Sequence, residues 1–299
     1  MACGQAYPSK PIRIVTSGAG GNPDIVARLV APGMSAALGK PIVVDNHPDI
    51  IAAELVSKAN PDGYILLVAG GTFIIGRLMK ELPYDPVREF SPVILLVISP
   101  NVLVVHPSLP VNSVKGLIAL AKSRPGQLNY ASSGVGGAAQ LATELFKSMA
   151  GALNIVRVNF RSMGAGGIEA LIAGEVQLTV SSVGPLLPHI KSGKLRALAV
   201  TTSGPSQLAP GLPTVGESVP GYVAVGMTGI FAPSRTPVAV INRLNLEIMK
   251  VLGEAEIKEK FLNAGSETAG NSPQEFAAAI ESETAKWGKV IKDAGIKAD

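Results

Sequence analysis

The feature that most constrains the fold is an alternation of short apolar runs with longer amphipathic stretches along the 299 residues. The short runs have the length and composition of buried strands, whereas the stretches between them carry apolar residues at helical spacing. Eight runs stand out, namely IRIV, PIVVD, ILLVA, NVLVV, LNYAS, IVRVNF, VQLTV and LRALAV. Strands that alternate with helices predict an α/β protein.

The first of these runs leads into a glycine-rich bend. Residues 17–21 read SGAGG, and an apolar helix is expected to follow, with Asn22 as its N-cap and Pro23 as its first residue. Glycine lets a backbone approach a ligand closely, and a helix N-terminus offers unpaired N–H groups and a partial positive charge. The bend is therefore a candidate anion site.

The same arrangement returns in the middle of the chain, in LNYASSGVGGAAQLATELFKSM. Ser132 and Ser133 end the strand, glycines follow at Gly134, Gly136 and Gly137, and an apolar helix comes next. Either loop alone is also compatible with an ordinary tight turn. The repetition favours a pair of anion-binding loops, one in each half of the chain.

An alternative reading of the second loop is a dinucleotide site. Residues 134–139 match G-x-G-x-x-A between a strand and a helix, and Arg161 follows the next strand, where it could bind a 2′-phosphate. The alternative function is thus an NADP-dependent oxidoreductase. Against it, no His, Tyr-Lys or Cys constellation follows to handle hydride transfer.

Composition argues against several other classes. The net charge is +4 with a pI near 9.1, but the lysines are scattered and only 4% of residues are aromatic, which disfavours nucleic acid. A single cysteine and three widely separated histidines give no metal-binding spacing, and no G-x-S-x-G elbow is present. We therefore expect no metal, no cofactor and no enzymatic activity. No apolar stretch approaches the roughly 20 residues that span a bilayer.

The first six residues, MACGQA, look like the tail of a secretory signal whose apolar part is missing. This indicates a periplasmic protein whose export signal was removed or replaced. A disordered terminus is the alternative, and Cys3 is a candidate remnant of lipid attachment.

Beyond these local patterns, the chain from Tyr7 onward resembles the Bug-type solute receptors of tripartite tricarboxylate transporters. The resemblance lies in an ordered series of segments, which are YPSKPIRIV, DIVARL, LGKPIVVDN, PDGYILL, LPYDPVREFSPV, NVLVVHPS, PGQLNYASSG, LPHIKSGKLRALAVT, LPTVGESVPGY and EFAAAIESETAKWGKVIKDAGIK. It implies a two-domain periplasmic binding protein of the type II-like, venus-flytrap class. Such a protein is a monomer that closes on a small organic mono- or dicarboxylate and delivers it to transporter membrane subunits.

The resemblance also implies where the ligand binds, largely through backbone amides and hydroxyls. The expected ligand-binding residues of the first domain are Ser17, Gly18, Ala19, Gly20, Asp24 and Thr72. Those of the second domain are Ser132, Ser133, Gly134 and Gly136.

The chain departs from the family pattern in ways that bear on the ligand. Where the family has Pro-Tyr-Lys/Arg-Gly, this chain has Asn159 followed by Phe160 and Arg161, and Ser181 and Ser182 replace a common Asp-Asn pair. We include Phe160, Arg161, Ser181 and Ser182 in the candidate site. Arg161 is the candidate partner of a second carboxylate.

Two long strand-like runs, VILLVISPNVLVV and VAVGMTGIFAP, are expected to cross between the domains as hinge strands. This assigns residues 7–106 and 223–299 to the first domain and residues 107–222 to the second.

Overall fold

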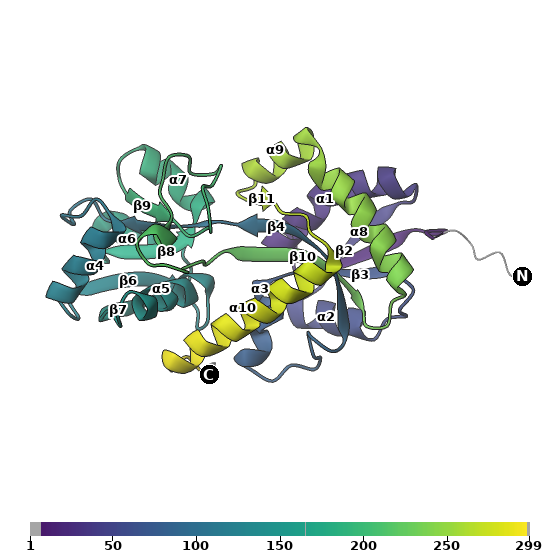
Figure 1. The fold of residues 1–299 in the computed structure, drawn as a ribbon, viewed down its shortest axis with the longest axis horizontal. Coiled ribbons are helices and arrows are strands. Elements are labelled where there is room, and N and C mark those ends of the chain that lie inside the picture. Colours follow the sequence, from purple (N-terminus) through teal and green to yellow (C-terminus); the bar gives the residue numbers. More distant parts are fainter. Residues whose placement is uncertain (1–6, 165, 298–299) are drawn as a thin grey trace, which may run out of the picture. The chain divides into compact units, whose positions relative to one another are not determined.

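The computed structural model describes residues 7–164 and 166–297. The expectations for Cys3 and the MACGQA segment lie outside these residues. By internal packing the chain divides into two units, residues 1–98 with 227–286 and residues 99–226 with 287–299. Each unit contains its own sheet (Figure 1).

Unit 1 is built around a six-stranded sheet with the order β11-β4-β10-β3-β1-β2. The first part of the chain supplies β1 (Ile12–Thr16), α1 (Asn22–Leu38), β2 (Ile42–Asn46), α2 (Asp49–Ser57), β3 (Ile65–Gly70), α3 (Gly71–Ile75), η1 (Gly76–Leu78) and β4 (Phe90–Ser99). The last part supplies β10 (Gly226–Pro233), α8 (Val238–Gly253), α9 (Ala255–Asn263), β11 (Glu267–Thr268) and α10 (Pro273–Asp293), whose final residues fall in unit 2.

The strands of unit 1 nearest the N-terminus pair in parallel. β1 lies parallel to both β2 and β3, whereas β10 runs antiparallel to β3 and β11 runs antiparallel to β4. α1 packs against α8 and α9 over this sheet (Figure 1). Val26, Val30 and Met34 of α1 are at most 1% exposed, because they face the shared core.

The start of α1 differs by one residue from the expectation. The N-cap is Gly21, with φ −70° and ψ 158°, and Asn22 is the first helical residue. Pro23 lies in the first turn, where its missing N–H costs no hydrogen bond. Gly39 ends the helix at φ +66°, a left-handed conformation that suits glycine.

Unit 2 is built around a five-stranded sheet with the order β7-β6-β8-β5-β9. Its elements are β5 (Asn101–Val105), α4 (Val114–Ser123), β6 (Leu128–Ser133), α5 (Ala138–Met149), β7 (Ile155–Phe160), α6 (Gly167–Ala173), β8 (Leu178–Ser182), α7 (Val183–Lys191), β9 (Arg196–Val200) and η2 (Val215–Glu217). β6 is parallel to β7 and β8, while β5 is antiparallel to β8 and β9.

The long apolar run at residues 93–105 is two strands rather than one. Pro100 separates β4 from β5, and proline cannot donate a ladder hydrogen bond. β5 belongs to the sheet of unit 2, although the sequence-based boundary at residue 106 included it in the first domain. Which residues move together, and hence the boundaries at 106 and 222, stays a prediction.

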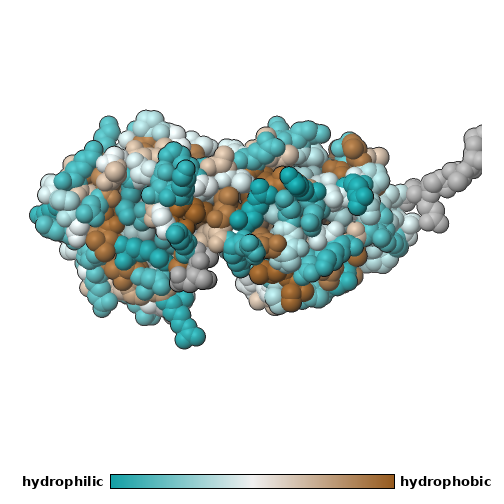
Figure 2. Space-filling model, turned by 90° about the horizontal axis from the view of Figure 1, so that it is seen from below, coloured by the Kyte–Doolittle hydropathy of each residue, from teal (hydrophilic) through white to brown (hydrophobic). Residues whose placement is uncertain are grey.

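Figure 2 shows hydrophilic and hydrophobic residues interspersed on the drawn face of each unit. Large apolar side chains with substantial exposure come from several elements, including Val43 of β2, Val156 of β7 and Val238 of α8. Scattered apolar residues of this kind are ordinary on protein surfaces. Within the described parts of the chain, no helix has the length and apolar character needed to cross a membrane.

Candidate functional site

The predicted residues of unit 1 lie at the carboxyl ends of two adjacent parallel strands. Residues 17–21 connect β1 to α1, and Thr72 lies in α3, which begins directly after β3. The register pairs Thr16 with Val68, so both loops leave the sheet at the same edge. In open α/β sheets, ligands bind at this edge, where neighbouring strands send their connections to opposite sides.

The first glycine loop is held by one backbone hydrogen bond within the loop and one to the side chain of Asp24. The N–H of Gly20 donates to Oδ2 of Asp24 at 2.8 Å, and the N–H of Gly21 donates to the carbonyl of Gly18 at 3.2 Å. Gly20 has φ +82°, which disfavours any residue with a side chain. The amide of Gly20, one of those expected to bind a carboxylate, is therefore already engaged. Within the described chain, the N–H groups of Gly18 and Ala19 have no acceptor.

Asp24 is the centre of this arrangement and is only 3% exposed. Its Oδ1 accepts from Nε of Arg28 at 2.9 Å and from Nδ2 of Asn46 at 2.8 Å. Burial raises the pKa of Asp24, but the hydrogen bonds from Asn46 and Gly20 and the charge of Arg28 outweigh burial and hold the pKa below the ordinary 3.8. Asp24 is thus a carboxylate at neutral pH.

Ser17 contributes a hydroxyl that is left without a partner. Its Oγ is buried and forms no hydrogen bond to any residue that the structure describes. A Cβ added to Gly21 would lie 3.1 Å from this oxygen, so glycine at position 21 leaves room beside the hydroxyl. A buried hydroxyl without a partner calls for a ligand or water that completes it.

The second glycine loop repeats the design at the carboxyl end of β6. Gly137 is the N-cap of α5, and the N–H of Gly136 donates to Oε1 of Gln140 at 2.8 Å. Gly134 and Gly136 have φ of +64° and +70°. Within the described chain, the N–H of Val135 at the tip of the loop has no acceptor.

A cation that sequence reasoning missed lies against this loop. Arg157 of β7 donates from Nε to Oγ of Ser132 at 2.7 Å, and from Nη2 to the carbonyl of Gly134 at 2.5 Å and to Oδ1 of Asn159 at 2.8 Å. β7 is the edge strand beside β6, and the register pairs Arg157 with Tyr130 and Asn159 with Ser132. The signal was present in IVRVNF, where Arg157 and Asn159 share one face of the strand.

The other predicted residues of unit 2 lie at the ends of β7 and β8. Phe160 is half-buried and packs against the core of the unit, whereas Arg161 is exposed and makes no ion pair with a described residue. Ser181 and Ser182 end β8, which neighbours β6 on the other side. The parallel strands β6, β7 and β8 thus bring the predicted residues of this unit to one edge of its sheet.

The sheet of unit 2 also bears on the NADP alternative. Dinucleotide-binding folds use a mostly parallel sheet made of two consecutive βαβαβ halves. Here the antiparallel strand β5 lies between β8 and β9. The G-x-G-x-x-A match at 134–139 therefore lies in a different sheet topology from the one in which that motif binds pyrophosphate.

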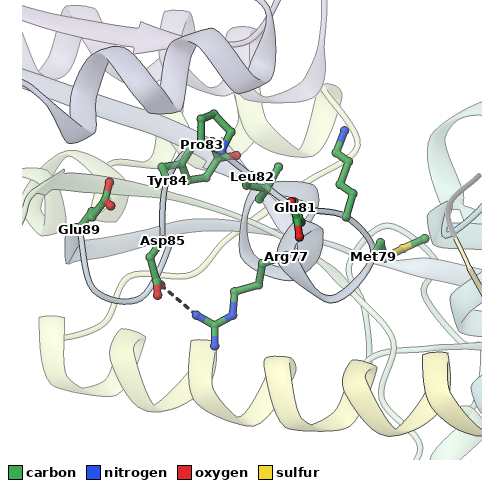
Figure 3. Close-up of a pocket in the computed structure, with 9 residues that line it drawn as sticks. Arg77, Met79, Glu81, Leu82, Pro83, Tyr84, Asp85 and Glu89 are labelled. Atoms are coloured by element: carbon green, nitrogen blue, oxygen red, sulfur yellow. Dashed lines mark hydrogen bonds and ion pairs between the residues drawn. The ribbon is translucent and has the colours of Figure 1, made fainter.

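A cavity of about 730 Å³ lies elsewhere in unit 1 (Figure 3). It is lined by Arg77, Met79, Lys80, Glu81, Leu82, Pro83, Tyr84, Asp85 and Glu89, none of them a predicted site residue. Figure 3 shows Arg77 directed at Asp85, and their ion pair measures 2.9 Å. Three acidic side chains against two basic ones give this cavity no preference for an anion.

Comparison with known families decides what kind of protein carries these two loops. The profile of the TctC family, described as "Tripartite tricarboxylate transporter family receptor", matches residues 26–296. This chain belongs to that family. Members of the TctC family are periplasmic solute receptors, and the resemblance seen in the sequence is confirmed.

Relatives match the receptor over nearly all of its length. BugT of Bordetella pertussis is 33% identical over 299 residues, which cover 97% of this chain and 91% of BugT. A structure of Rpa4515 of R. palustris with adipate is 35% identical, covers 97% of this chain and 99% of its own, and has a TM-score of 0.77. MatC of Rhodopseudomonas palustris with bound malate is 27% identical, and the match covers 95% of this chain and 100% of MatC with a TM-score of 0.72.

These comparisons confirm the α/β, two-domain periplasmic binding protein fold that was expected for a TctC receptor. The individual site residues stay predictions. Within each unit the structure brings them to one sheet edge, and it adds three side chains that organise the loops, namely Arg28, Asn46 and Arg157.

Proposed function

We propose that this chain is an extracytoplasmic receptor that binds a small organic mono- or dicarboxylate and delivers it to the membrane subunits of a tripartite tricarboxylate-type transporter. We further propose that it acts in the periplasm as a monomer, without cofactor or metal, and that it catalyses no reaction. The observation that carries the proposal is the pair of glycine loops, each at a helix N-terminus and each with backbone N–H groups lacking a protein acceptor.

The chemistry of the loops suits a carboxylate. The amides of Gly18, Ala19 and Val135 are donors without an acceptor among the described residues, and the buried hydroxyl of Ser17 lacks a partner. A carboxylate offers about four acceptor positions, which neutral donors at helix N-termini satisfy well. The relatives Rpa4515 and MatC are described with adipate and malate, and both ligands are small dicarboxylates.

We propose that both loops bind the same ligand, together with the residues at the neighbouring strand ends. The proposed contacts are Ser17, Gly18, Ala19, Gly20, Asp24, Thr72, Ser132, Ser133, Gly134, Gly136, Phe160, Arg161, Ser181 and Ser182. Arg161 is proposed to pair with a second carboxylate, because it is exposed and has no ion-pair partner in the described chain.

A thermal-shift screen of mono- and dicarboxylates, with adipate and malate included, tests the binding function. A ligand present at 100 times its dissociation constant stabilises the folded state by about 2.7 kcal/mol, so a true ligand raises the Tm measurably. Native mass spectrometry of the purified protein identifies any solute that is carried along. Stabilisation by NADP, with none by any carboxylate, would contradict the proposal.

The role of Arg161 is tested separately with a dicarboxylate identified in the screen and the monoamide of that dicarboxylate. Arg161→Ala is expected to weaken the dicarboxylate by about 2–5 kcal/mol and the monoamide much less, because only the dicarboxylate loses a charge partner. Ser133→Val is the matched control, since crowding at the glycine loop should weaken both ligands alike. Equal losses for the two ligands in Arg161→Ala would remove Arg161 from the site.

A further inference from the structure

The guanidinium of Arg157 links the end of β6, the glycine loop and β7. Its Nε bonds to Ser132 at the end of β6, and its Nη2 bonds both to the carbonyl of Gly134 in the loop and to Asn159 in β7. Ser132 is fully buried, so the guanidinium is anchored on a side chain that cannot move aside. A planar guanidinium with several donors in fixed directions suits this task better than a single ammonium group does.

The loop at 133–137 needs such an anchor because its glycines make its backbone flexible. Gly134 and Gly136 occupy left-handed φ values, and glycine has more backbone conformations available than any other residue. At the helix end, the bond from the Gly136 amide to Gln140 already fixes the chain. At the strand end, the carbonyl of Gly134 is held by Arg157.

The charge of Arg157 is not balanced by a neighbouring carboxylate. Its three acceptors are a hydroxyl, a carbonyl and a side-chain amide, and no carboxylate of the described chain lies within 4.0 Å of it. In unit 1, by contrast, Arg28 pairs with Asp24 at 2.9 Å. A half-buried cation without a counter-charge makes the loop at 133–137 the more attractive of the two for an anion.

We propose that Arg157 is the positioning residue of the 133–137 loop: it holds the loop in its ligand-binding conformation and gives this loop a positive charge. The positioning role stands on the geometry alone, whereas the effect on carboxylate affinity rests on the proposed function. Arg157 acts through Gly134 and Ser132, and the two hydrogens of its Nη1 have no acceptor in the described chain.

Backbone order parameters of the ligand-free protein test the positioning role without any assumption about the ligand. In the wild type we expect the amides of residues 133–137 to show values near 0.85, the range of a rigid backbone. In Arg157→Met they should fall below about 0.6, and in Arg157→Lys to an intermediate value, because an ammonium replaces only part of the bonding. Arg161→Met is the matched control and should leave the loop unchanged. Unaltered order parameters in both Arg157 variants would overturn the inference.

Calorimetry with adipate adds the functional readout. Arg157→Met should bind adipate about 10- to 100-fold more weakly than wild type, and Arg157→Lys should recover part of that loss because it keeps the charge. Wild-type affinity in Arg157→Met would contradict the contribution of its charge. If the wild type does not bind adipate, adipate is not a ligand of this receptor. The order parameters then still decide the positioning role of Arg157. Should Arg157→Met fail to fold, Arg157→Lys decides in its place.

Discussion

The backbone N–H of Gly136 donates to Oε1 of Gln140 four residues later, at 2.8 Å. In unit 1, the N–H of Gly20 donates in the same way to Oδ2 of Asp24, also four residues later and also at 2.8 Å. Both bonds fold a glycine loop back onto the first turn of its helix. The two loops therefore share a geometry but differ in charge, since one acceptor is a carboxylate and the other a neutral amide.

This difference predicts that Gln140→Glu weakens carboxylate binding without changing the conformation of the loop. A glutamate at position 140 can still accept from Gly136, but it places a negative charge beside the proposed anion site. We expect about a tenfold loss of affinity for adipate by calorimetry, corresponding to about 1.4 kcal/mol. The order parameters of residues 133–137 serve as the control and should stay high. An unchanged or higher affinity would argue against a carboxylate at this loop.

Asp24→Asn is expected to destabilise the protein in a pH-dependent way. The pKa of Asp24 in the folded protein lies below the ordinary 3.8, so its stabilising effect is complete above that value. As the pH falls below about 3.8 and through the folded pKa, that contribution is lost. The free energy of unfolding should therefore differ by about 1–3 kcal/mol between wild type and variant at pH 7, and by clearly less at pH 3. A urea titration series from pH 3 to 7 measures this, and a constant difference would contradict the prediction.

Asn46→Asp tests the same network from its other side. Nδ2 of Asn46 donates to the carbonyl of Ser17 at 2.7 Å and to Asp24 at 2.8 Å, and an aspartate offers only acceptors to both. We expect the free energy of unfolding to fall by about 2–4 kcal/mol at pH 7. The effect should be smaller at pH 4, where the two carboxyl groups can share a proton. Asn60→Asp, at an exposed position in the same unit, is the control and should change stability by less than about 0.5 kcal/mol.

Two glycines at helix ends are expected to respond to alanine with opposite signs. At Gly137 an added Cβ would lie 2.2 Å from the carbonyl oxygen of Ser133, so Gly137→Ala must shift the loop backbone. We expect it to lower stability by about 1–3 kcal/mol. Gly253, the last residue of α8, has open space around its Cβ position, and Gly253→Ala should stabilise by up to about 1 kcal/mol. Thermal unfolding distinguishes the two, and equal effects would contradict the steric argument.

The positions of the strands could be predicted from the sequence far better than their pairing in the sheets. Each of the eight apolar runs coincides with most or all of a strand, because buried strands and amphipathic helices have local periodicities that can be seen in the sequence. The placement of β10 between β4 and β3 could not be predicted in this way. That pairing joins segments more than a hundred residues apart, and no local pattern records it.

The candidate site, like the fold, could be predicted only in its local features. The glycines of both loops could be found because their backbone role is local, but Arg157, Asn46 and Gln140 could not be assigned, because their contacts depend on register and side-chain direction. Arg161 drew attention because it follows the end of β7 directly. The cation that contacts the loop is four residues earlier, inside the strand.

The insertion of β10 into the sheet of unit 1 dictates an order of assembly during synthesis. Residues 99–226 form most of unit 2 as one continuous segment, whereas β3 and β4 of unit 1 are joined only by a strand that ends at Pro233. Until that strand emerges, β3 and β4 each present an unpaired edge, the kind of surface that recruits other chains. The sheet that is begun first is therefore the sheet that is completed last.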